Sequence, residues 1–315
     1  MSKLSILEKL KNEIYLIAGD ASPRKFFRFK SKKGQVLVHC HKDKNTNLKN
    51  YIKVNNLLIQ NNFKAPKTLV SNFKKDYIII EDFGDNLIKK NIKNKKNVTY
   101  TFKKIIDELV KLQKIKIRNR LPNYSYKLLS NELKLFYDWY LPEFFNKKKT
   151  NEIKKKINLS LKKLIKDTVK FNNVFVHRDF HVENLVIYKK KVAFLDTQDA
   201  VIGHQAYDLM SLIDDVRINL KKEDQLKLLN YYIKISNKVN RDFIYHFHIL
   251  SIQRQLKILG IFIRLYRRDQ KKKYLKYIFR TWKLIDLRLK YSKLSGIKSI
   301  FDKYFPNQIK RKKWK

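Results

Sequence analysis

Apolar positions in the first eighty residues follow the two-residue period of β-strands, with one helical interruption. Alternating or short apolar runs predict strands at 15–17, 26–29, 35–39, 69–70 and 77–80. Apolar residues recur at helical spacing over 47–60, and Pro66 lies beyond the predicted end of that helix. A short helix is also expected before the first strand. This region therefore predicts a small sheet with one longer helix packed on it.

The pattern changes at residues 81–85, Glu-Asp-Phe-Gly-Asp, and helical spacing dominates after them. No proline occurs between Pro142 and Pro306, which favours long helices. Amphipathic helices are predicted around three sets of apolar positions, within 102–112, 209–216 and 252–263. We predict an α+β fold in which residues 1–82 are small and β-rich, and residues 83–315 are mostly helical.

The composition is that of a globular protein. The chain has 315 residues, of which 43% are hydrophobic and 13% aromatic, so it can form a core. Cys40 is its one cysteine, which excludes a disulfide framework within the chain and suits a reducing compartment. We expect no signal peptide in the first ten residues and no run of membrane-spanning length. The sequence therefore predicts a cytoplasmic protein with no membrane partner.

The net charge of +45 has two interpretations. Such an excess is typical of proteins that bind nucleic acid or anionic membranes. However, the lysines are spread along the whole chain, and Lys, Asn, Ile, Phe and Tyr are abundant together, as A/T-rich codons would produce. We favour compositional bias, and we expect no specific nucleic-acid partner.

One polar segment between apolar runs carries candidate chemistry. Residues 177–184 read His-Arg-Asp-Phe-His-Val-Glu-Asn, the H-R-D-x-x-x-x-N pattern of the catalytic loop in protein kinases and their relatives. The apolar runs 185–188 and 192–195 follow it, and we predict that they form a β-hairpin. That hairpin would bring Asn184, before its first strand, beside Asp196, after its second.

These polar side chains suit phosphoryl transfer. The reaction needs a carboxylate to accept the proton of the attacking hydroxyl, and oxygen ligands that hold Mg²⁺ against a triphosphate. Asp179 is the predicted catalytic base, Asn184 and Asp196 are the predicted metal ligands, and ATP and Mg²⁺ are the predicted cofactors. The fold would then be bilobal and protein-kinase-like, with 1–82 as the nucleotide-binding lobe and 83–315 as the catalytic and substrate lobe.

Several parts of a protein kinase are missing. All six glycines are isolated, so there is no G-x-G-x-x-G loop. His39 and Cys40 stand where the strand lysine would be expected, and the helix predicted over 47–60 has no glutamate to pair with such a lysine. Residues 197–206 leave no room for an activation segment before Asp208. These absences favour a kinase of small molecules.

The chain resembles the aminoglycoside/choline phosphotransferase superfamily. Within it, the chain is similar to the anomeric sugar kinases that phosphorylate N-acetylmuramate and N-acetylglucosamine in cell-wall recycling. Four segments carry the resemblance: 19–22 with 26–29; 80–85; 177–196 with 198–200 and 206–209; and Gln253-Arg254 with 256–262. The first and the last are more specific than the catalytic loop, which the whole superfamily shares.

The resemblance implies roles in nucleotide binding. Residues 19–22 would form the turn over the triphosphate, with Ser22 and Arg28 at the phosphates. Arg24 and Lys25 are the other basic residues near this turn that could contact the phosphates. The hinge that meets adenine would contain Glu81 and Phe83.

The resemblance also implies the residues around the acceptor. These are His181 and Asp199, near the catalytic loop, and Gln253 and Arg254, further along the chain. Asp208 would brace the backbone of the catalytic loop without taking part in the chemistry.

We therefore expect an ATP-dependent sugar kinase that phosphorylates the anomeric hydroxyl of N-acetylmuramate and N-acetylglucosamine, giving the sugar 1-phosphate. The alternative is a kinase of another small alcohol, of the choline or aminoglycoside type. Arg254 favours a neutral or anionic sugar over a cation such as choline. A basic kinase-fold pseudoenzyme that binds nucleic acid is disfavoured, because Asp179, Asn184 and Asp196 are all present.

Overall fold

The computed structural model describes residues 6–19, 24–40, 45–92, 98–117, 120–236 and 239–314. The chain divides into two compact units. The first comprises Met1–Thr101 and Asp179–Ala200, and the second comprises Phe102–Arg178 and Val201–Lys315. The division by role at residue 82 stays a prediction.

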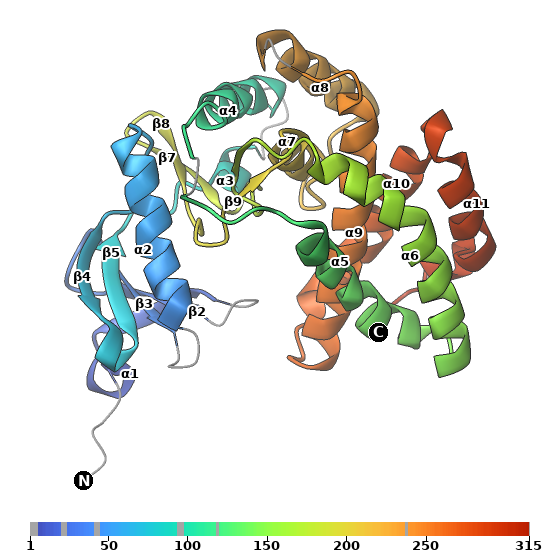
Figure 1. Ribbon diagram of the computed structural model, residues 1–315. Coiled ribbons are helices and arrows are strands. Elements are labelled where there is room, and N and C mark those ends of the chain that lie inside the picture. The colour runs from blue at the N-terminus through green and yellow to red at the C-terminus, as the bar shows by residue number, and fades with distance from the viewer. Residues whose placement is uncertain are drawn as a thin grey trace. The chain divides into compact units, whose positions relative to one another are not determined.

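The first unit is built on a five-stranded antiparallel sheet (Figure 1). Its strands lie in the order β1 (Ile14–Ala18), β2 (Arg24–Phe29), β3 (Gln35–Cys40), β5 (Tyr77–Glu81) and β4 (Thr68–Asn72). The short helix α1 (Ile6–Lys9) precedes the sheet, α2 (Asn45–Gln60) follows β3, and the 3₁₀ turn η2 (Phe73–Lys75) joins β4 to β5. The small sheet with one longer helix, predicted from the apolar pattern, is confirmed.

Alternation along the strands divides the side chains of this sheet between two faces. On one face, Val36, Val38 and Cys40 pack with Leu48 and Tyr51 of α2. On the other face, Leu37 packs with Ile14 and Phe29, near α1. Phe26 belongs to the α2 side, so the period of two places Arg24 and Arg28 on that same side of β2.

The predicted hairpin is present in the first unit. β7 (Leu185–Tyr188) pairs with β8 (Lys191–Phe194), and the register sets Leu185 opposite Phe194. Lys189 and Lys190 form the two-residue turn, and both have positive φ, 47° and 62°. A type I′ turn requires that conformation at both positions, and asparagine and glycine adopt it more easily than lysine. Single bridges join Val186 to Leu87, just before α3 (Ile88–Asn91), and Ala193 to Lys64.

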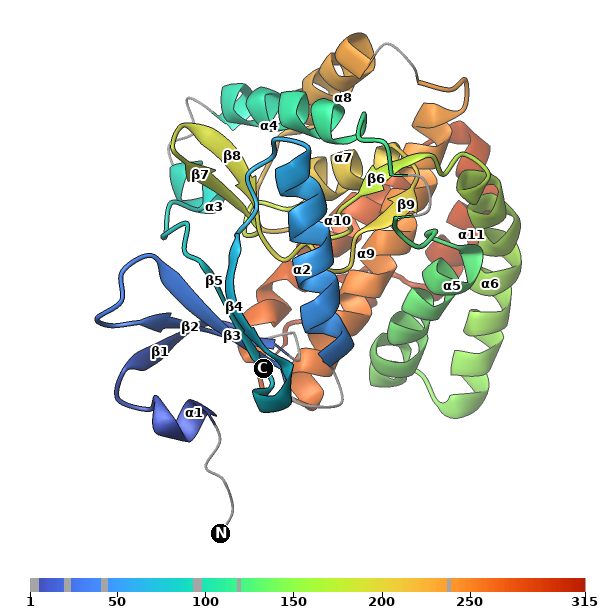
Figure 2. The ribbon, with the colours of Figure 1, turned by 60° about the vertical axis from the view of Figure 1, so that its left-hand side comes forward.

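The second unit is mostly helical (Figure 2). Its elements are α4 (Val98–Leu112, which begins in the first unit), α5 (Tyr126–Leu135), the π-helical turn η4 (Phe136–Tyr140), η5 (Leu141–Glu143), α6 (Lys147–Val169), α7 (Ala206–Ile213), α8 (Lys222–Ser236), α9 (Phe243–Arg267), η6 (Lys272–Tyr277), α10 (Ile278–Leu289), η7 (Ser292–Leu294), α11 (Ser295–Tyr304) and α12 (Asn307–Lys310). A two-stranded sheet of β6 (Val174–Val176) and β9 (Val201–Gly203) completes it. This agrees with the predicted helical region.

The long helix α9 forms the centre of the second unit. Most of its residues are buried, and α5, α7 and α10 pack against it (Figures 1 and 2). Gly260 lies where α9 crosses the end of α5. A Cβ added at Gly260 would lie 2.1 Å from the carbonyl carbon of Leu135, so the two backbones touch. No helix in the described ranges is both long enough and apolar enough to cross a membrane.

Candidate active site

The catalytic loop leaves β6 through a backbone that one buried carboxylate holds in place. Asp208 on α7 accepts hydrogen bonds from the backbone N–H of His177 at 2.6 Å and of Arg178 at 3.1 Å. Arg178 has a left-handed backbone with φ of 73°, which an ordinary side chain adopts only when its surroundings impose it. The predicted bracing role of Asp208 is confirmed for the backbone of His177 and Arg178.

The side chain of Arg178 is anchored in the second unit by Glu132 of α5. One oxygen of Glu132 accepts from Arg178 Nη2 at 2.6 Å and from Lys257 Nζ at 2.9 Å. The other accepts from the hydroxyl of Tyr124 at 2.7 Å and from Gln253 Nε2 at 3.2 Å. Burial alone would raise the pKa of Glu132, but Lys257 and Arg178 outweigh it and lower the pKa to about 2. Glu132 is therefore ionised and fully hydrogen-bonded.

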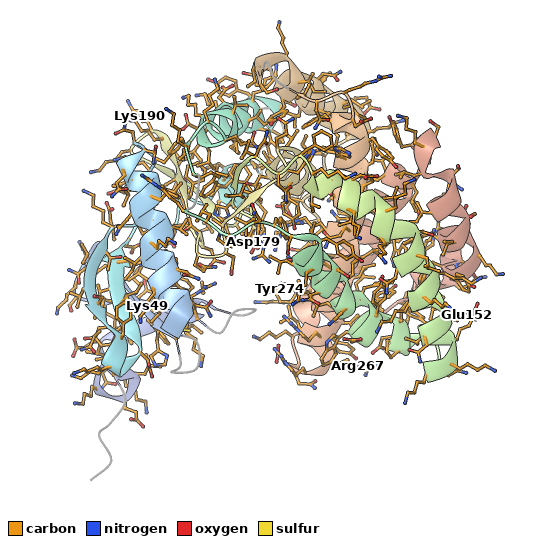
Figure 3. All side chains as sticks on the ribbon, viewed as in Figure 1. Lys49, Glu152, Asp179, Lys190, Arg267 and Tyr274 are labelled. Carbon is orange, nitrogen blue, oxygen red and sulfur yellow. The ribbon has the colours of Figure 1, made fainter. Side chains whose placement is uncertain are left out.

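The three residues predicted to carry the chemistry come together in the first unit. The backbone N–H of Leu195 donates to the carbonyl of Asn184 at 2.9 Å, so the two ends of the hairpin lie side by side as predicted. Asn184 Nδ2 donates to the backbone carbonyl of Asp179 at 3.1 Å, which leaves its amide oxygen as a ligand for a cation. Asp179, labelled in Figure 3, is half-buried at the start of this segment.

Asp196 follows β8 in a left-handed conformation, with φ of 57°. Its carboxylate accepts from Arg24 Nη2 at 3.1 Å, and 28% of its side chain is exposed. The pKa of Asp196 is raised to about 6, mainly by burial; Arg24 lowers this pKa, while Asp179 and Asp199 contribute to raising it. Asp179 and Asp199 thus lie near enough to Asp196 for their charges to influence its pKa.

Of the residues predicted at the phosphates, Ser22 lies outside the described residues. Arg28 holds the hinge, because its guanidinium donates to Asp82 at 2.6 and 3.0 Å and to Asp85 at 2.7 Å. Gly19 has φ of 129°, and a Cβ there would lie 2.5 Å from the carbonyl oxygen of Arg24. Only glycine permits so close an approach of residue 19 to β2.

The residues predicted at adenine lie at the end of β5. Phe83 is buried, and its ring lies 4.4 Å from that of Tyr188 on the hairpin. The hydroxyl of Tyr188 donates to Glu81 at 3.2 Å. The hinge is thus fastened to the hairpin that carries Asn184 and Asp196 at its ends.

The residues predicted at the acceptor are divided between the units. In the first, His181 is buried and its backbone N–H donates to the carbonyl of Asp179 at 3.0 Å, while Asp199 accepts from Gln198 at 2.7 Å. In the second, Gln253 is fully buried, and its amide donates to Glu132 and to the carbonyl of Leu129.

Arg254, also in the second unit, is only 4% exposed. It lies near Tyr207, whose pKa its charge lowers against the larger, opposite effect of burial. Among the described residues it makes no hydrogen bond or ion pair, which is unusual for a buried guanidinium. All four acceptor roles remain predictions.

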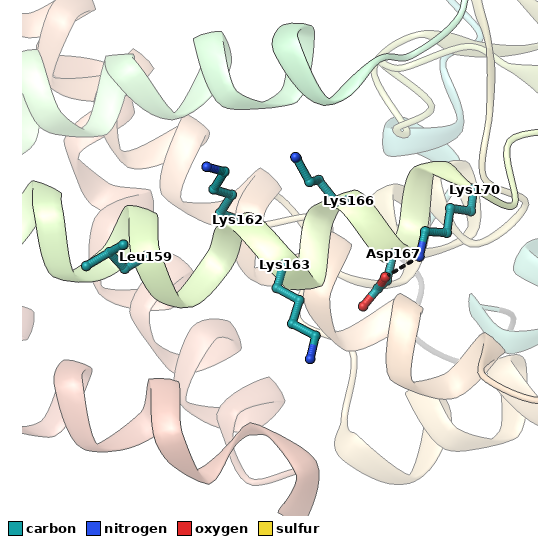
Figure 4. A pocket seen from close by; sticks show the side chains of 6 residues that line it. All are labelled: Leu159, Lys162, Lys163, Lys166, Asp167 and Lys170. Carbon is teal, nitrogen blue, oxygen red and sulfur yellow. Dashed lines mark hydrogen bonds and ion pairs between the residues drawn. The ribbon is translucent and has the colours of Figure 1, made fainter.

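Sequence reasoning missed Glu132 and Lys257, and it did not single out Arg24. Glu132 and Lys257 look like ordinary charges on amphipathic helices, and only the fold shows that Glu132 meets both Lys257 and Arg178. A hollow of the second unit on α6 contains none of the predicted site residues (Figure 4). It is lined by Leu159, Lys162, Lys163, Lys166, Asp167 and Lys170.

Two curated kinases are similar in sequence to this chain. The N-acetylmuramate/N-acetylglucosamine kinase of Pseudomonas aeruginosa is 27% identical over 84% of this chain and 80% of its own. Its counterpart in Neisseria meningitidis is 29% identical over 83% of this chain and 81% of its own.

Two solved structures share the fold. The ADP-bound aminoglycoside phosphotransferase APH(2'')-Ib has a TM-score of 0.61 at 14% identity, covering 89% of this chain and 94% of its own. The choline kinase LicA from Streptococcus pneumoniae has a TM-score of 0.62 at 14% identity, covering 93% and 98%. The model of the phosphotransferase enzyme family matches residues 13–241, which include the catalytic loop and the hairpin. The chain therefore belongs to the phosphotransferase enzyme family.

Proposed function

We propose that this protein is an ATP-dependent kinase of N-acetylated amino sugars that produces the sugar 1-phosphate, with N-acetylmuramate and N-acetylglucosamine as acceptors. The observation that carries the proposal is the complete set of Asp179, Asn184 and Asp196 in a chain similar over more than four-fifths of its length to kinases named for those two sugars. A cytoplasmic location is part of the proposal.

Asp179 would act on the acceptor hydroxyl. The anomeric hydroxyl is more acidic than other sugar hydroxyls, because the ring oxygen withdraws electron density from it. A carboxylate can therefore orient this hydroxyl and accept its proton late in the transfer. The backbone of Asp179 is held through Asn184 and His181, which keeps the carboxylate in register with the rest of the loop.

The donor set fits Mg²⁺. Asn184 and Asp196 offer hard oxygen ligands, and no cluster of three or more metal-binding side chains exists among the described residues. Mg²⁺ usually binds one or two protein oxygens and completes its shell with water and phosphate, so two ligands suffice. When bound, the metal would neutralise charge on the transferred phosphoryl group.

Arg254 supports an acidic acceptor. A buried guanidinium with no carboxylate partner among the described residues is a candidate for pairing with a carboxylate supplied by the ligand. N-acetylmuramate carries such a group on its lactyl ether, and N-acetylglucosamine does not.

The test is incubation with Mg-ATP and a panel of N-acetylmuramate, N-acetylglucosamine, choline and an aminoglycoside, with products identified by ³¹P NMR. We expect the 1-phosphate of both amino sugars. A sugar 6-phosphate, or turnover of choline alone, would overturn the assignment and leave the family unaffected.

A substitution tests the role of Arg254. Arg254→Ala should lower kcat/KM for N-acetylmuramate by roughly tenfold to a hundredfold, the value of one charge-assisted hydrogen bond, and affect N-acetylglucosamine much less. The control is Arg268→Ala, which removes an exposed arginine paired with Asp269 at the end of α9. Equal losses of kcat/KM for the two sugars would instead indicate that Arg254 stabilises the fold.

A further inference from the structure

β3 has no cation at the position where a protein kinase has the lysine that faces the nucleotide phosphates. A protein kinase pairs a lysine on the third strand with a glutamate on the following helix. Here β3 contains neither lysine nor arginine, and α2 contains no acidic residue. At the end of β3, Cys40 is fully buried in the apolar cluster with Leu48 and Tyr51.

Arg24, on the neighbouring strand, lies opposite that position. It is the register partner of Cys40 and shares the α2 side of the sheet with it. Its side chain is 4% exposed, and its Nη2 donates to Asp196 at 3.1 Å across 172 residues of sequence. From α2, the neutral side-chain amide of Asn55 accepts from Thr197, the residue after Asp196, at 2.5 Å.

We propose that Arg24 binds the nucleotide phosphates, taking from β2 the place that a lysine on β3 has in protein kinases. The inference rests on the proposed use of ATP. Oxygens bound to one Mg²⁺ lie about 2.1 Å from the metal, hence about 3 Å from one another. A phosphate oxygen that shares a metal with Asp196 would thus come within reach of a guanidinium that already touches Asp196. The planar fork of arginine can donate to both at once.

The other basic residues of β2 are less suited. Arg28 is held by Asp82 and Asp85 at the hinge. Lys25 is exposed and points to the opposite side of the sheet from Arg24. Arg24 is thus the cation of this strand that combines burial with contact to a predicted metal ligand.

A purely structural role for Arg24 makes the opposite prediction. If Arg24 only neutralised Asp196, its removal would free that carboxylate for the metal, and binding of Mg-ADP would be unchanged or tighter. If Arg24 binds phosphate, its removal weakens the binding of ADP both with and without Mg²⁺. The sign of the change therefore separates the two roles.

The experiment is calorimetric titration of the full chain with Mg-ADP, ADP in excess chelator, and adenosine. Arg24→Ala should raise the Kd of both Mg-ADP and metal-free ADP by roughly tenfold to a hundredfold, and it should change the Kd of adenosine by no more than about twofold. Asp196→Ala should weaken the binding of Mg-ADP more than the binding of metal-free ADP. Lys53→Ala, which removes one exposed charge from α2, should change none of the three.

Far-UV circular dichroism checks the fold of each variant, and Arg24→Gln provides a second, polar replacement with the same expected pattern. Unchanged or tighter Mg-ADP binding in either variant, or an equal loss for adenosine, would overturn the assignment. Failure of the wild-type protein to phosphorylate any amino sugar would overturn the proposed acceptor instead, because these titrations contain no sugar.

Discussion

The backbone of Asp179 is held by two contacts within the first unit. The side-chain amide of Asn184 and the backbone N–H of His181 both donate to its carbonyl. The loop that carries the carboxylate is therefore fixed at this residue. This arrangement suits a group that must meet one hydroxyl of a bound acceptor.

Removing the charge of Asp179 should leave this frame intact. Asp179→Asn keeps the shape of the side chain but cannot accept the hydroxyl proton, so kcat should fall by roughly 10² or more while ADP affinity is retained. Steady-state kinetics and calorimetry measure the two quantities, and Asp302→Asn, on the exposed surface of α11, is the control. Turnover near the wild-type rate would remove Asp179 from the mechanism.

The sequence could predict residues whose relationship is local. Asp179, Asn184 and Asp196 lie within one loop and one hairpin, so their spacing already indicates that they meet. The pairs Arg178–Glu132 and Arg24–Asp196 span 46 and 172 residues, and no spacing rule connects their members. Their identification required the fold.

At the scale of elements, the apolar period predicted the main strands of the first unit because β1, β2, β3 and β5 place apolar residues in the clusters with α2 or α1. It did not identify α6, a helix of 23 residues rich in lysine, as a separate element. Its buried positions, such as Ile153, Ile157 and Leu161, are few among many charges. The tight hairpin turn carries no local sequence signal, since Lys189-Lys190 is not a common I′ pair.

Gly260 provides a test of helix packing. In Gly260→Ala, the new Cβ would overlap the backbone of Leu135, so α9 and α5 must separate, and the variant should lose about 3 kcal/mol or more of unfolding free energy. Thermal and urea unfolding, followed by circular dichroism, measure the loss.

The matched control is Gly296→Ala in α11. A Cβ at Gly296 would meet no atom within 4 Å, so this variant should be neutral or gain up to about 1 kcal/mol from helix propensity. Similar stability of the two alanine variants would show that α9 and α5 do not pack as described.

For the whole molecule, the dominant property is the charge of +45. Nitrogen-tipped side chains extend from helices and strands throughout Figure 3. The lysines on α6 in Figure 4 are one example, and Lys170 there is partly neutralised by Asp167 at 2.8 Å. This dispersed distribution agrees with compositional bias.

A dispersed charge should bind polyanions without selecting among them. We expect RNA affinity to fall by at least about tenfold between roughly 50 and 150 mM salt, to be independent of sequence, and to leave sugar turnover unchanged at the higher salt. Fluorescence anisotropy with two unrelated RNAs and a kinetic assay with added RNA measure these effects. Tight, sequence-selective binding at the higher salt would restore the nucleic-acid interpretation.

The ion pair between Arg178 and Glu132 has a consequence for control of the enzyme. In many protein kinases, arginines of the active region meet a phosphate that another enzyme adds to the activation loop, so the charge that orders the site comes and goes. Here the chain encodes that negative charge as a buried carboxylate with a pKa of about 2. No modifying enzyme is required to supply it, and the translated protein carries it from the start. We expect flux through such a kinase to follow the supply of its two substrates, with regulation exerted through the amount of protein that the cell makes.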